Sequence, residues 1–259
     1  MARAQVQVLP TPGALVTVAA DRFVALAAAA ISAYGRFHVA MSGGTTPKRL
    51  YETLATDRYA ARVDWSRVHL FWGDERCMPP TDPSSNYRMA RETLIDHIAV
   101  PDENIHRIHG EDDPAAAAAA YERELRHVFR IPAGPPMPGA RFDLVLLGLG
   151  LDGHTASLFP GLTAVSEQER WVTAAYVAEV SMWRVSCTPV VFNTAAEVVF
   201  LVVGPDKAAM LRQVLEGQVL EGPHQPALLP AQVIAPSDGS VCWLLDADAG
   251  ANLTQAGAP

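Results

Sequence analysis

The chain has 259 residues, of which 49% are hydrophobic and 19% charged, and this apolar fraction is too high for a disordered protein. Acidic residues number 28 against 20 lysines and arginines, so the formal net charge is −8, which argues against a general nucleic-acid-binding protein. The length allows one large α/β domain or two small ones. Composition does not exclude a small anionic ligand, because a local pocket can be positive on an acidic protein.

Short apolar runs alternate with helix-like stretches along the chain. The runs predict strands at Leu15–Ala19, Phe37–Met41, Val68–Trp72, Leu144–Leu149, Val198–Val203 and Val241–Leu245. Helices are predicted at Asp21–Ala33, Pro47–Thr56 after an N-cap at Thr46, Tyr87–Ile98, Pro114–Phe129 and Asp206–Leu215. This alternation predicts an α/β fold of modified Rossmann-like type, with a mainly parallel sheet and helices on both faces.

One segment between these elements is rich in proline and glycine, from Ile131 to Arg141. Because the alternation of strands and helices continues on both sides of it, we interpret it as a surface loop and expect a single domain over residues 1–259. The tail at residues 250–259 has no apolar pattern, and we expect it to be frayed.

The three cysteines, Cys77, Cys187 and Cys242, are far apart and have no zinc-binding spacing, so we interpret them as structural thiols in a reducing compartment. A reactive thiol at Cys77, directly after Arg76, is the alternative, and it requires a lowered pKa. The N-terminus is a poor signal peptide, and no uninterrupted apolar run approaches about 18 residues. We therefore expect a soluble, cytoplasmic protein with neither a membrane nor a nucleic-acid partner.

The first segment that carries chemistry begins at Ser42 and continues through Gly43, Gly44 and Thr45. A buried strand enters a glycine-rich turn and then a helix, whose free N–H groups suit a phosphate. The sequence is neither GxxxxGK[ST] nor GxGxxG, so the nucleotide motifs do not apply. A plain strand–turn–helix junction is the alternative.

Two further strands end in polar loops. Asp74, Glu75 and Arg76 follow the strand that ends at Trp72, where ligands lie in open α/β sheets. A solvated charged loop, or a structural ion network that includes Asp152, would explain them equally well. Asn86 follows shortly and either folds over the same opening or only starts the next helix.

The strand before Gly148 continues into a loop that presents Asp152 and His154. The ordinary pKa of histidine, about 6.5, suits general-base chemistry near neutral pH. Arg184 and Lys207 each place one cation near a strand or helix start. These two cations bear on a phosphate only if they converge on the Gly43–Gly44 turn, and the sequence does not show whether they do.

Together these motifs resemble the 6-phosphogluconolactonase family, which belongs with the glucosamine-6-phosphate deaminases to one superfamily. The resemblance extends from Ser42-Gly43-Gly44-Thr45 to Leu229-Pro230-Ala231. Trp72-Gly73-Asp74-Glu75-Arg76 and the Asp152-Gly153-His154 loop look like the lactonase version. The deaminases carry Asn-Glu-Pro after that loop, whereas this chain has Leu158-Phe159-Pro160.

The resemblance implies hydrolysis of 6-phospho-D-glucono-1,5-lactone to 6-phosphogluconate in the oxidative pentose phosphate pathway, without a nucleotide cofactor. We expect no metal, because an ester already has a fair leaving group. The hypothesis that follows is that His154 is the general base and that Asp152 or Asp74 orients it or the sugar. Arg76 would orient the substrate or stabilise an oxyanion. The phosphate would lie against Ser42, Gly43, Gly44 and Thr45, near Arg184 and Lys207. The alternatives are a deaminase or isomerase and a non-catalytic sugar-phosphate-binding module.

Overall fold

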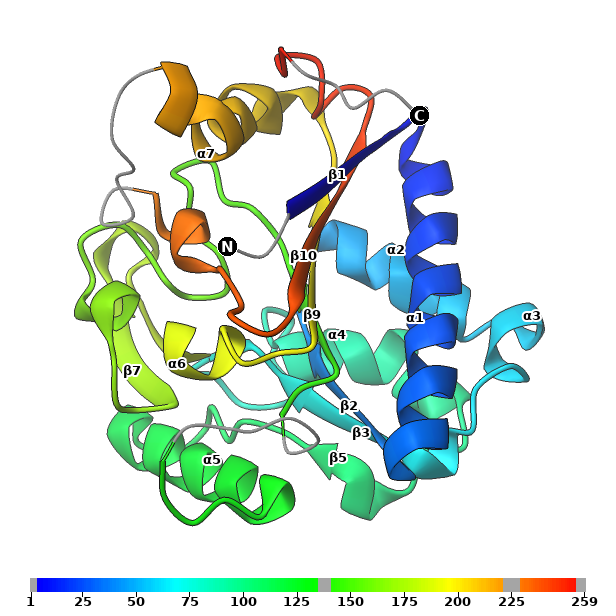
Figure 1. The fold of residues 1–259 in the computed structure, drawn as a ribbon. Helices are drawn as coiled ribbons and strands as arrows, with labels where there is room; N and C mark the ends of the chain where they lie inside the picture. The colour runs from blue at the N-terminus through cyan, green and yellow to red at the C-terminus, as the bar shows by residue number, and fades with distance from the viewer. Residues whose placement is uncertain (1–3, 135–140, 221–228, 255–259) are drawn as a thin grey trace.

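A seven-stranded sheet forms the centre of the protein, seen here in a computed structural model that describes residues 4–134, 141–220 and 229–254 (Figure 1). All its neighbouring strands are parallel, in the order β1-β10-β9-β6-β2-β3-β5. The strands are β1 (Ala4–Leu9), β2 (Phe37–Met41), β3 (Val68–Trp72), β5 (Ile105–His106), β6 (Leu144–Leu147), β9 (Glu197–Val202) and β10 (Ser240–Asp246).

The order of the strands reverses between β2 and β6. From β2 the chain adds β3 and β5 on one side, whereas β6, β9 and β10 extend the sheet on the other. Such a switch point opens a crevice at the carboxyl ends of the two strands, and ligands of open α/β sheets bind there. The glycine-rich turn follows β2 and the Asp152–His154 loop follows β6, so topology brings both to this crevice.

A smaller antiparallel sheet, absent from the sequence prediction, joins β4 (Asp74–Arg76), β8 (Met182–Cys187) and β7 (Val172–Val177). Its register pairs Asp74 with Ser186 and Arg76 with Arg184. β4 is hard to predict, because it has three charged residues and no apolar alternation.

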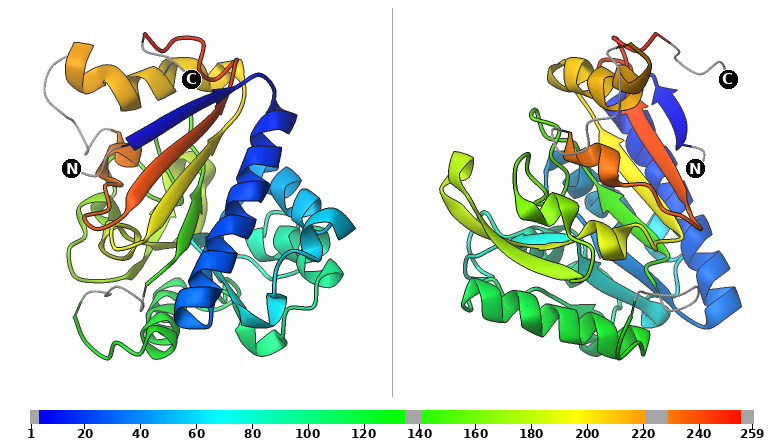
Figure 2. Two further views of the ribbon diagram at one scale, coloured as in Figure 1. Left: turned by 45° about the vertical axis from the view of Figure 1, so that its right-hand side comes forward. Right: turned by 60° about the vertical axis from the view of Figure 1, so that its left-hand side comes forward.

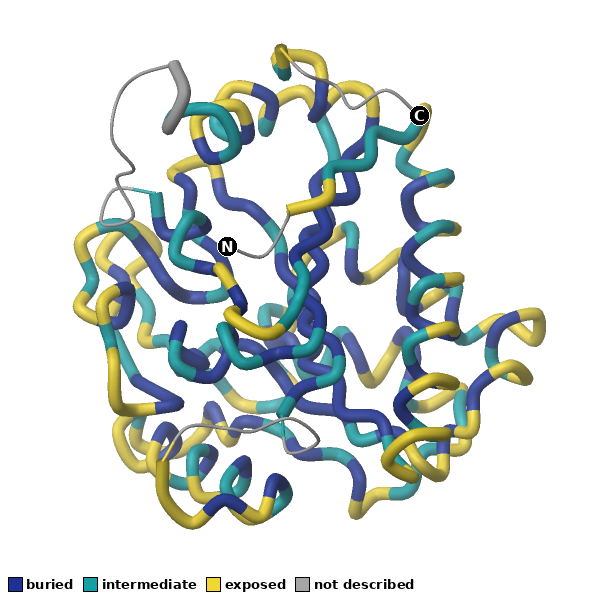
Figure 3. Tube along the Cα trace, viewed as in Figure 1, coloured by how far each residue is buried: buried dark blue, intermediate teal, exposed yellow. Residues whose placement is uncertain are grey.

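Helices cover both faces of the main sheet, as expected. The helices are α1 (Pro12–Tyr34), α2 (Thr45–Leu54), α3 (Asp57–Ala60), α4 (Asn86–Thr93), α5 (Pro114–Phe129), α6 (Pro189–Phe192) and α7 (Ala208–Leu220). α1 and α2 lie on one face, while the small sheet with α5 and α6 lies on the other (Figure 2). The strands between these layers are almost wholly buried, and exposed residues gather on the outer sides of the helices and on the loops (Figure 3).

The predicted strand at Leu15–Ala19 is wrong, because these residues belong to α1. Thr11 caps this helix by accepting the Ala14 N–H at 3.1 Å, and Pro12 follows at its first position. Its buried residues recur with helical spacing from Leu15 to Ala30, so its β-branched residues pack as part of an apolar helical stripe. The first strand of the sheet is instead β1, which the prediction missed.

By length and composition alone, α1 is apolar enough to cross a membrane. The expectation of no such segment rested on uninterrupted apolar runs, and Asp21 and Arg22 interrupt this one. In the fold, eight residues of α1 are buried in the core.

Two predicted termini also differ from the structure. The tail was expected to fray from residue 250, but Gly250 N–H donates to the Asp246 carbonyl at 3.0 Å and Thr254 N–H donates to Glu216 at 2.7 Å. Residues 255–259 lie outside the described residues, as do residues 135–140 of the predicted loop. The helix expected to end at Leu215 continues to Leu220.

Candidate active site

A cavity of about 680 Å³ lies at the carboxyl ends of β2 and β6. Nine of the ten predicted site residues line it: Ser42, Gly43, Gly44, Thr45, Asp74, Arg76, Asp152, His154 and Lys207. Arg184 is not among the lining residues. The fold therefore brings together four segments that could be identified in the sequence only one by one.

The turn after β2 leaves the start of α2 without a side-chain cap. Gly44 is the N-cap residue, its φ of 106° lies in the left-handed region that favours glycine, and no side chain accepts a hydrogen bond there. The predicted N-cap at Thr46 is wrong, because Thr45 and Thr46 already belong to the helix. The first N–H groups of α2 thus border the cavity with no side chain bound to them, which is a geometry that favours an anion.

Buried groups hold this turn in place. The Tyr51 hydroxyl accepts the Ser42 N–H at 2.9 Å and donates to the Ser42 carbonyl at 2.8 Å. Burial raises the pKa of Tyr51, so the phenol keeps its proton. Both backbone groups of Ser42 are therefore fixed by one side chain from α2.

Asn86 lines the cavity beside the turn and is also the first residue of α4, so both interpretations of this residue hold. Its amide donates to the Asp74 carbonyl at 2.9 Å. A Cβ placed on Gly43 would lie 2.0 Å from Asn86 Oδ1, so only glycine fits against this amide. Ser85, not Asn86, caps α4, by accepting the Arg88 N–H.

Asp152 and His154 form a hydrogen-bonded pair on the loop after β6. His154 Nδ1 lies 2.5 Å from Asp152 Oδ1, which also accepts the His154 N–H at 3.1 Å. Burial raises the pKa of Asp152, but these hydrogen bonds outweigh burial and the net shift is downward. An ionised Asp152 can only accept, so Nδ1 carries a proton, and in the neutral tautomer of the ring the lone pair is on Nε2.

Two neighbours fix the position of this pair. The His154 ring stacks on Phe159 with centroids 4.1 Å apart. A Cβ on Gly150 would lie 2.1 Å from His154 Nδ1, so the close approach of the backbone requires glycine there. The side chain of His154 is 31% exposed, which leaves it accessible from the cavity.

Asp74 is held apart from His154. Its carboxylate accepts a hydrogen bond from the Ser157 hydroxyl at 2.6 Å, and it is 7% exposed where it lines the cavity. Asp152 is thus the carboxylate that orients His154. Asp74 is the second carboxylate that lines the cavity.

Glu75 points away from the cavity and joins β4 to α4. Its carboxylate accepts the N–H groups of Arg76, Asn86 and Tyr87, each at 2.8 Å, and the Ser85 hydroxyl at 3.0 Å. Burial raises the pKa of Glu75, and these hydrogen bonds partly oppose that shift. The alternative of an ion network does not describe this cluster, because no salt bridge joins Arg76 to Asp74 or Glu75 in the described structure.

Replacing Glu75 with glutamine should lower the free energy of unfolding by roughly 2–4 kcal/mol, since an amide NH₂ would face donors that the carboxylate now accepts. Urea denaturation measures this change. Glu92→Gln is the matched control on α4: its side chain is 57% exposed beside Arg88, so the expected loss is below about 0.5 kcal/mol. Equal losses in the two variants would contradict the role assigned to Glu75.

Arg76 and Arg184 lie opposite each other in the small sheet. Arg76 donates to the Ser84 carbonyl, and in the described part of the chain the Nε atoms of both arginines are buried without hydrogen-bond partners. Burial, and then the nearby charge of Arg76, lowers the pKa of Arg184. The carboxylates of Asp74 and Glu75 partly oppose this shift.

Lys207 ends the 3₁₀ helix Pro205–Lys207, which follows β9. Its ammonium lies 3.6 Å from Asp206 and lines the same cavity as the Gly43–Gly44 turn. Of Arg184 and Lys207, Lys207 is therefore the one that lines the cavity of the Gly43–Gly44 turn.

Cys77 does not have the properties of a reactive thiol. Burial raises its pKa to about 11, so little thiolate forms near neutral pH. Among the residues described, no group of three or more His, Cys, Asp or Glu side chains is arranged to hold a metal ion.

Comparisons with known proteins agree with this geometry. A family model described as glucosamine-6-phosphate isomerases/6-phosphogluconolactonase matches residues 10–243. The 6-phosphogluconolactonase of Nostoc sp. is 39% identical over 250 residues, covering 96% of this chain and 98% of that protein. The 6-phosphogluconolactonase of Synechocystis sp. is 41% identical over 225 residues, covering 86% and 88%.

Solved structures give the same result. The 6-phosphogluconolactonase from Trypanosoma cruzi has a TM-score of 0.84 at 30% identity, covering 98% of each chain. A monomeric glucosamine-6-phosphate deaminase has a TM-score of 0.79 at 18% identity, which shows a shared fold alone.

Proposed function

Because this chain belongs to the glucosamine-6-phosphate isomerase/6-phosphogluconolactonase family, we propose that it hydrolyses 6-phospho-D-glucono-1,5-lactone with His154 as the general base. Curated 6-phosphogluconolactonases match it at 34–41% identity over most of its length, and it is an enzyme of this class. The observation that carries the mechanism is that the Asp152–His154 pair and the uncapped start of α2 line one cavity.

The phosphate of the substrate would bind at the start of α2. Ser42, Gly43, Gly44 and Thr45 offer backbone N–H groups and hydroxyls there, and Lys207 adds a cation in the same cavity. Arg184 does not line the cavity, but it lies beside Arg76 and its positive charge would attract the phosphate at longer range. The phosphate thereby anchors one end of the lactone.

His154 would then act on water. With Nδ1–H held by Asp152, the Nε2 lone pair removes a proton from a water molecule as the oxygen attacks the lactone carbonyl carbon. When the tetrahedral intermediate collapses, the ring C–O bond breaks and His154 returns the proton to the leaving ring oxygen. The products are a carboxylic acid, ionised at neutral pH, and a free hydroxyl group.

Arg76 and Asp74 would contact the lactone carbonyl and the sugar hydroxyls of the substrate. Arg76 lines the cavity and can donate to the carbonyl oxygen as it gains negative charge, help that is often worth about 3 kcal/mol per donor. Asp74 faces the same space and can accept from sugar hydroxyls. Asn86, which lies beside Asp74, offers an amide oxygen in the same cavity.

A deaminase remains the second candidate within the same family. The resemblance places an acidic residue after the Asp-Gly-His loop of deaminases, but here Phe159 occupies that region and stacks on the His154 ring. This observation favours the lactonase.

The direct test gives purified protein freshly made 6-phospho-D-glucono-1,5-lactone and records acid release against a buffer blank, because the lactone also opens spontaneously. We expect a rate well above the blank. A rate equal to the blank would remove the enzyme proposal, and ammonia release from glucosamine 6-phosphate would favour the deaminase. The cytoplasmic location and the absence of nucleic-acid and membrane partners stay predictions.

Lys207→Ala should raise KM for the phosphorylated lactone by about tenfold or more and change kcat little, because it removes a charge from the binding of an unreactive group. Steady-state kinetics against substrate concentration separates the two constants. Lys48→Ala is the matched control: Lys48 is on α2 with its side chain 52% exposed and does not line the cavity. An unchanged KM in Lys207→Ala would reject the proposed phosphate site.

A further inference from the structure

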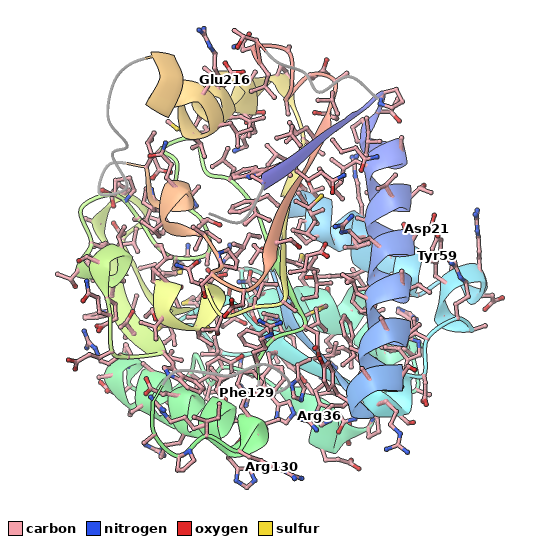
Figure 4. The ribbon with its side chains drawn as sticks, in the orientation of Figure 1. Asp21, Arg36, Tyr59, Phe129, Arg130 and Glu216 are labelled. Atoms are coloured by element: carbon pink, nitrogen blue, oxygen red, sulfur yellow. The ribbon has the colours of Figure 1, made fainter. Side chains whose placement is uncertain are left out.

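A second cavity, of about 910 Å³, lies at the amino ends of β2, β3 and β5, at the opposite ends of the strands from the active site. The last two turns of α5 form its other side. The residues of this amino-end cavity that matter here are Arg36, His38, His69, His106, Arg123 and Arg130. Arg36 and Arg130 lie toward the same end of the molecule, near Phe129 (Figure 4).

Three of these residues are histidines on neighbouring strands, and their hydrogen bonds fix their tautomers. His106 Nδ1 lies 2.7 Å from a carboxylate oxygen of Glu124, so it donates, and His106 Nε2 must accept from His69 Nδ1 at 3.0 Å. His38 Nδ1 lies 3.2 Å from the Arg141 carbonyl, which can only accept. In this arrangement His38 and His69 both keep the lone pair on Nε2.

The lone pair of His38 is buried and has no partner. His38 is 1% exposed, it lines the cavity, and its Nε2 makes no hydrogen bond with any described residue. Such an acceptor is normally satisfied by a donor. Burial, and then the neighbouring His69, lowers the pKa of His38 to about 3. Burial, and then the neighbouring His106, lowers the pKa of His69 to about 4, so both histidines stay neutral acceptors at physiological pH.

The charged groups around these acceptors are mainly basic. Four arginines and two glutamates line the cavity, in a protein whose net charge is −8. Arg126 donates a hydrogen bond to Glu122 at 2.8 Å and lies over the ring of Trp171. Glu124 accepts a hydrogen bond from His106. Within the described ranges, no hydrogen bond or ion pair engages the guanidinium of Arg123 or Arg130.

We propose that the amino-end cavity binds a small hydroxylated anion, of the sugar-acid or sugar-phosphate class. Arg123 and Arg130 meet its acidic group, and His38 and His69 accept hydrogen bonds from its hydroxyl groups. An anion without hydroxyls satisfies only the first requirement, and a neutral sugar satisfies only the second. This site is separate from the active site and does not depend on the lactonase mechanism.

The probe for this site is 6-phosphogluconate, titrated into the full-length protein by calorimetry at low salt. We expect two binding events in the wild type. The double variant Arg123→Gln/Arg130→Gln should weaken one of them at least tenfold and leave lactone hydrolysis unchanged. Both arginines are exposed, so this variant should fold, and circular dichroism checks that it does.

Arg49→Gln/Arg58→Gln is the control: it removes the same charge from exposed positions outside the described cavities, and it should weaken neither event. Lys207→Ala should weaken only the other event. A titration that Arg123→Gln/Arg130→Gln leaves unchanged would overturn the second site. Failure of Lys207→Ala alone would count against the active-site proposal instead.

Inorganic phosphate tests the role of the histidines. In the Lys207→Ala variant it should bind the amino-end cavity at least tenfold more weakly than 6-phosphogluconate, because it offers no sugar hydroxyl. Equal affinities would show that charge alone draws the anion, and the assignment of a hydroxylated ligand would then be wrong.

Discussion

His154→Ala should lower kcat about a hundredfold or more, with a much smaller change in KM. The general base contributes only as the proton moves, so its loss falls on the chemical step and not on phosphate binding. Stopped-flow or pH-stat assays on fresh lactone, corrected for spontaneous opening, measure this effect. The residual rate should still exceed the buffer blank, because the substrate remains bound near Arg76.

Asp152→Asn tests whether Asp152 sets the tautomer of the His154 ring, while His154 itself stays in place. An amide in this position can donate to His154 Nδ1, which would move the ring proton to Nε2 and remove the free lone pair. We therefore expect a loss of kcat close to that of His154→Ala.

His109→Ala is the control for His154→Ala, since His109 is exposed beside Glu111 and lies outside the active-site cavity. A near-native kcat for His154→Ala would assign the base to another residue.

Gly43→Ala should reduce kcat/KM strongly, by about tenfold or more, although it adds a single methyl group. The added Cβ would lie 2.0 Å from Asn86 Oδ1, so either the turn or the amide must move. Asn86 is tied to the Asp74 carbonyl, and the turn carries the start of α2. A displacement of either changes the phosphate site, and small misplacements of this kind are costly in catalysis.

Gly148→Ala is the matched control, because Gly148 lines the same cavity and a Cβ there meets nothing within 4 Å. We expect near-wild-type kinetics from it. The two variants therefore distinguish a steric clash at Gly43 from a general sensitivity of the active-site cavity to an added methyl group. If both variants lose activity equally, the contact between Gly43 and Asn86 is not the reason.

The centre of the sheet was predictable because its strands are almost wholly buried. β2 and β3 have the predicted bounds, and β6, β9 and β10 differ by one or two residues at their ends. Continuous apolar runs are typical of such strands. The run Leu15–Ala19 has the same composition and is helical, because Thr11 and Pro12 start a helix before it. Composition alone does not separate a buried helix from a buried strand.

The candidate site was predictable as separate segments and not as a cavity. Ligand sites follow the carboxyl ends of parallel strands, so the polar residues after β2, β3 and β6 could be chosen without coordinates. The small sheet could not be foreseen, because β4 has no apolar alternation and its partner β8 lies more than a hundred residues away. That pairing decides where Arg184 lies. The roles of Glu75 and Asn86 also depend on it, since both join β4 to α4.

The register that sets Arg76 opposite Arg184 has a consequence for the evolution and engineering of this protein. Like charges directly opposite each other weaken a sheet, and burial adds to the repulsion. A neutral residue in place of Arg184 would remove that repulsion and stabilise the fold, because the surroundings of Arg184 already disfavour its charge. Selection for thermal stability alone would therefore remove the charge at Arg184, whereas the proposed binding of an anionic substrate would keep it. Under the proposed function, stability and activity are in opposition at this position.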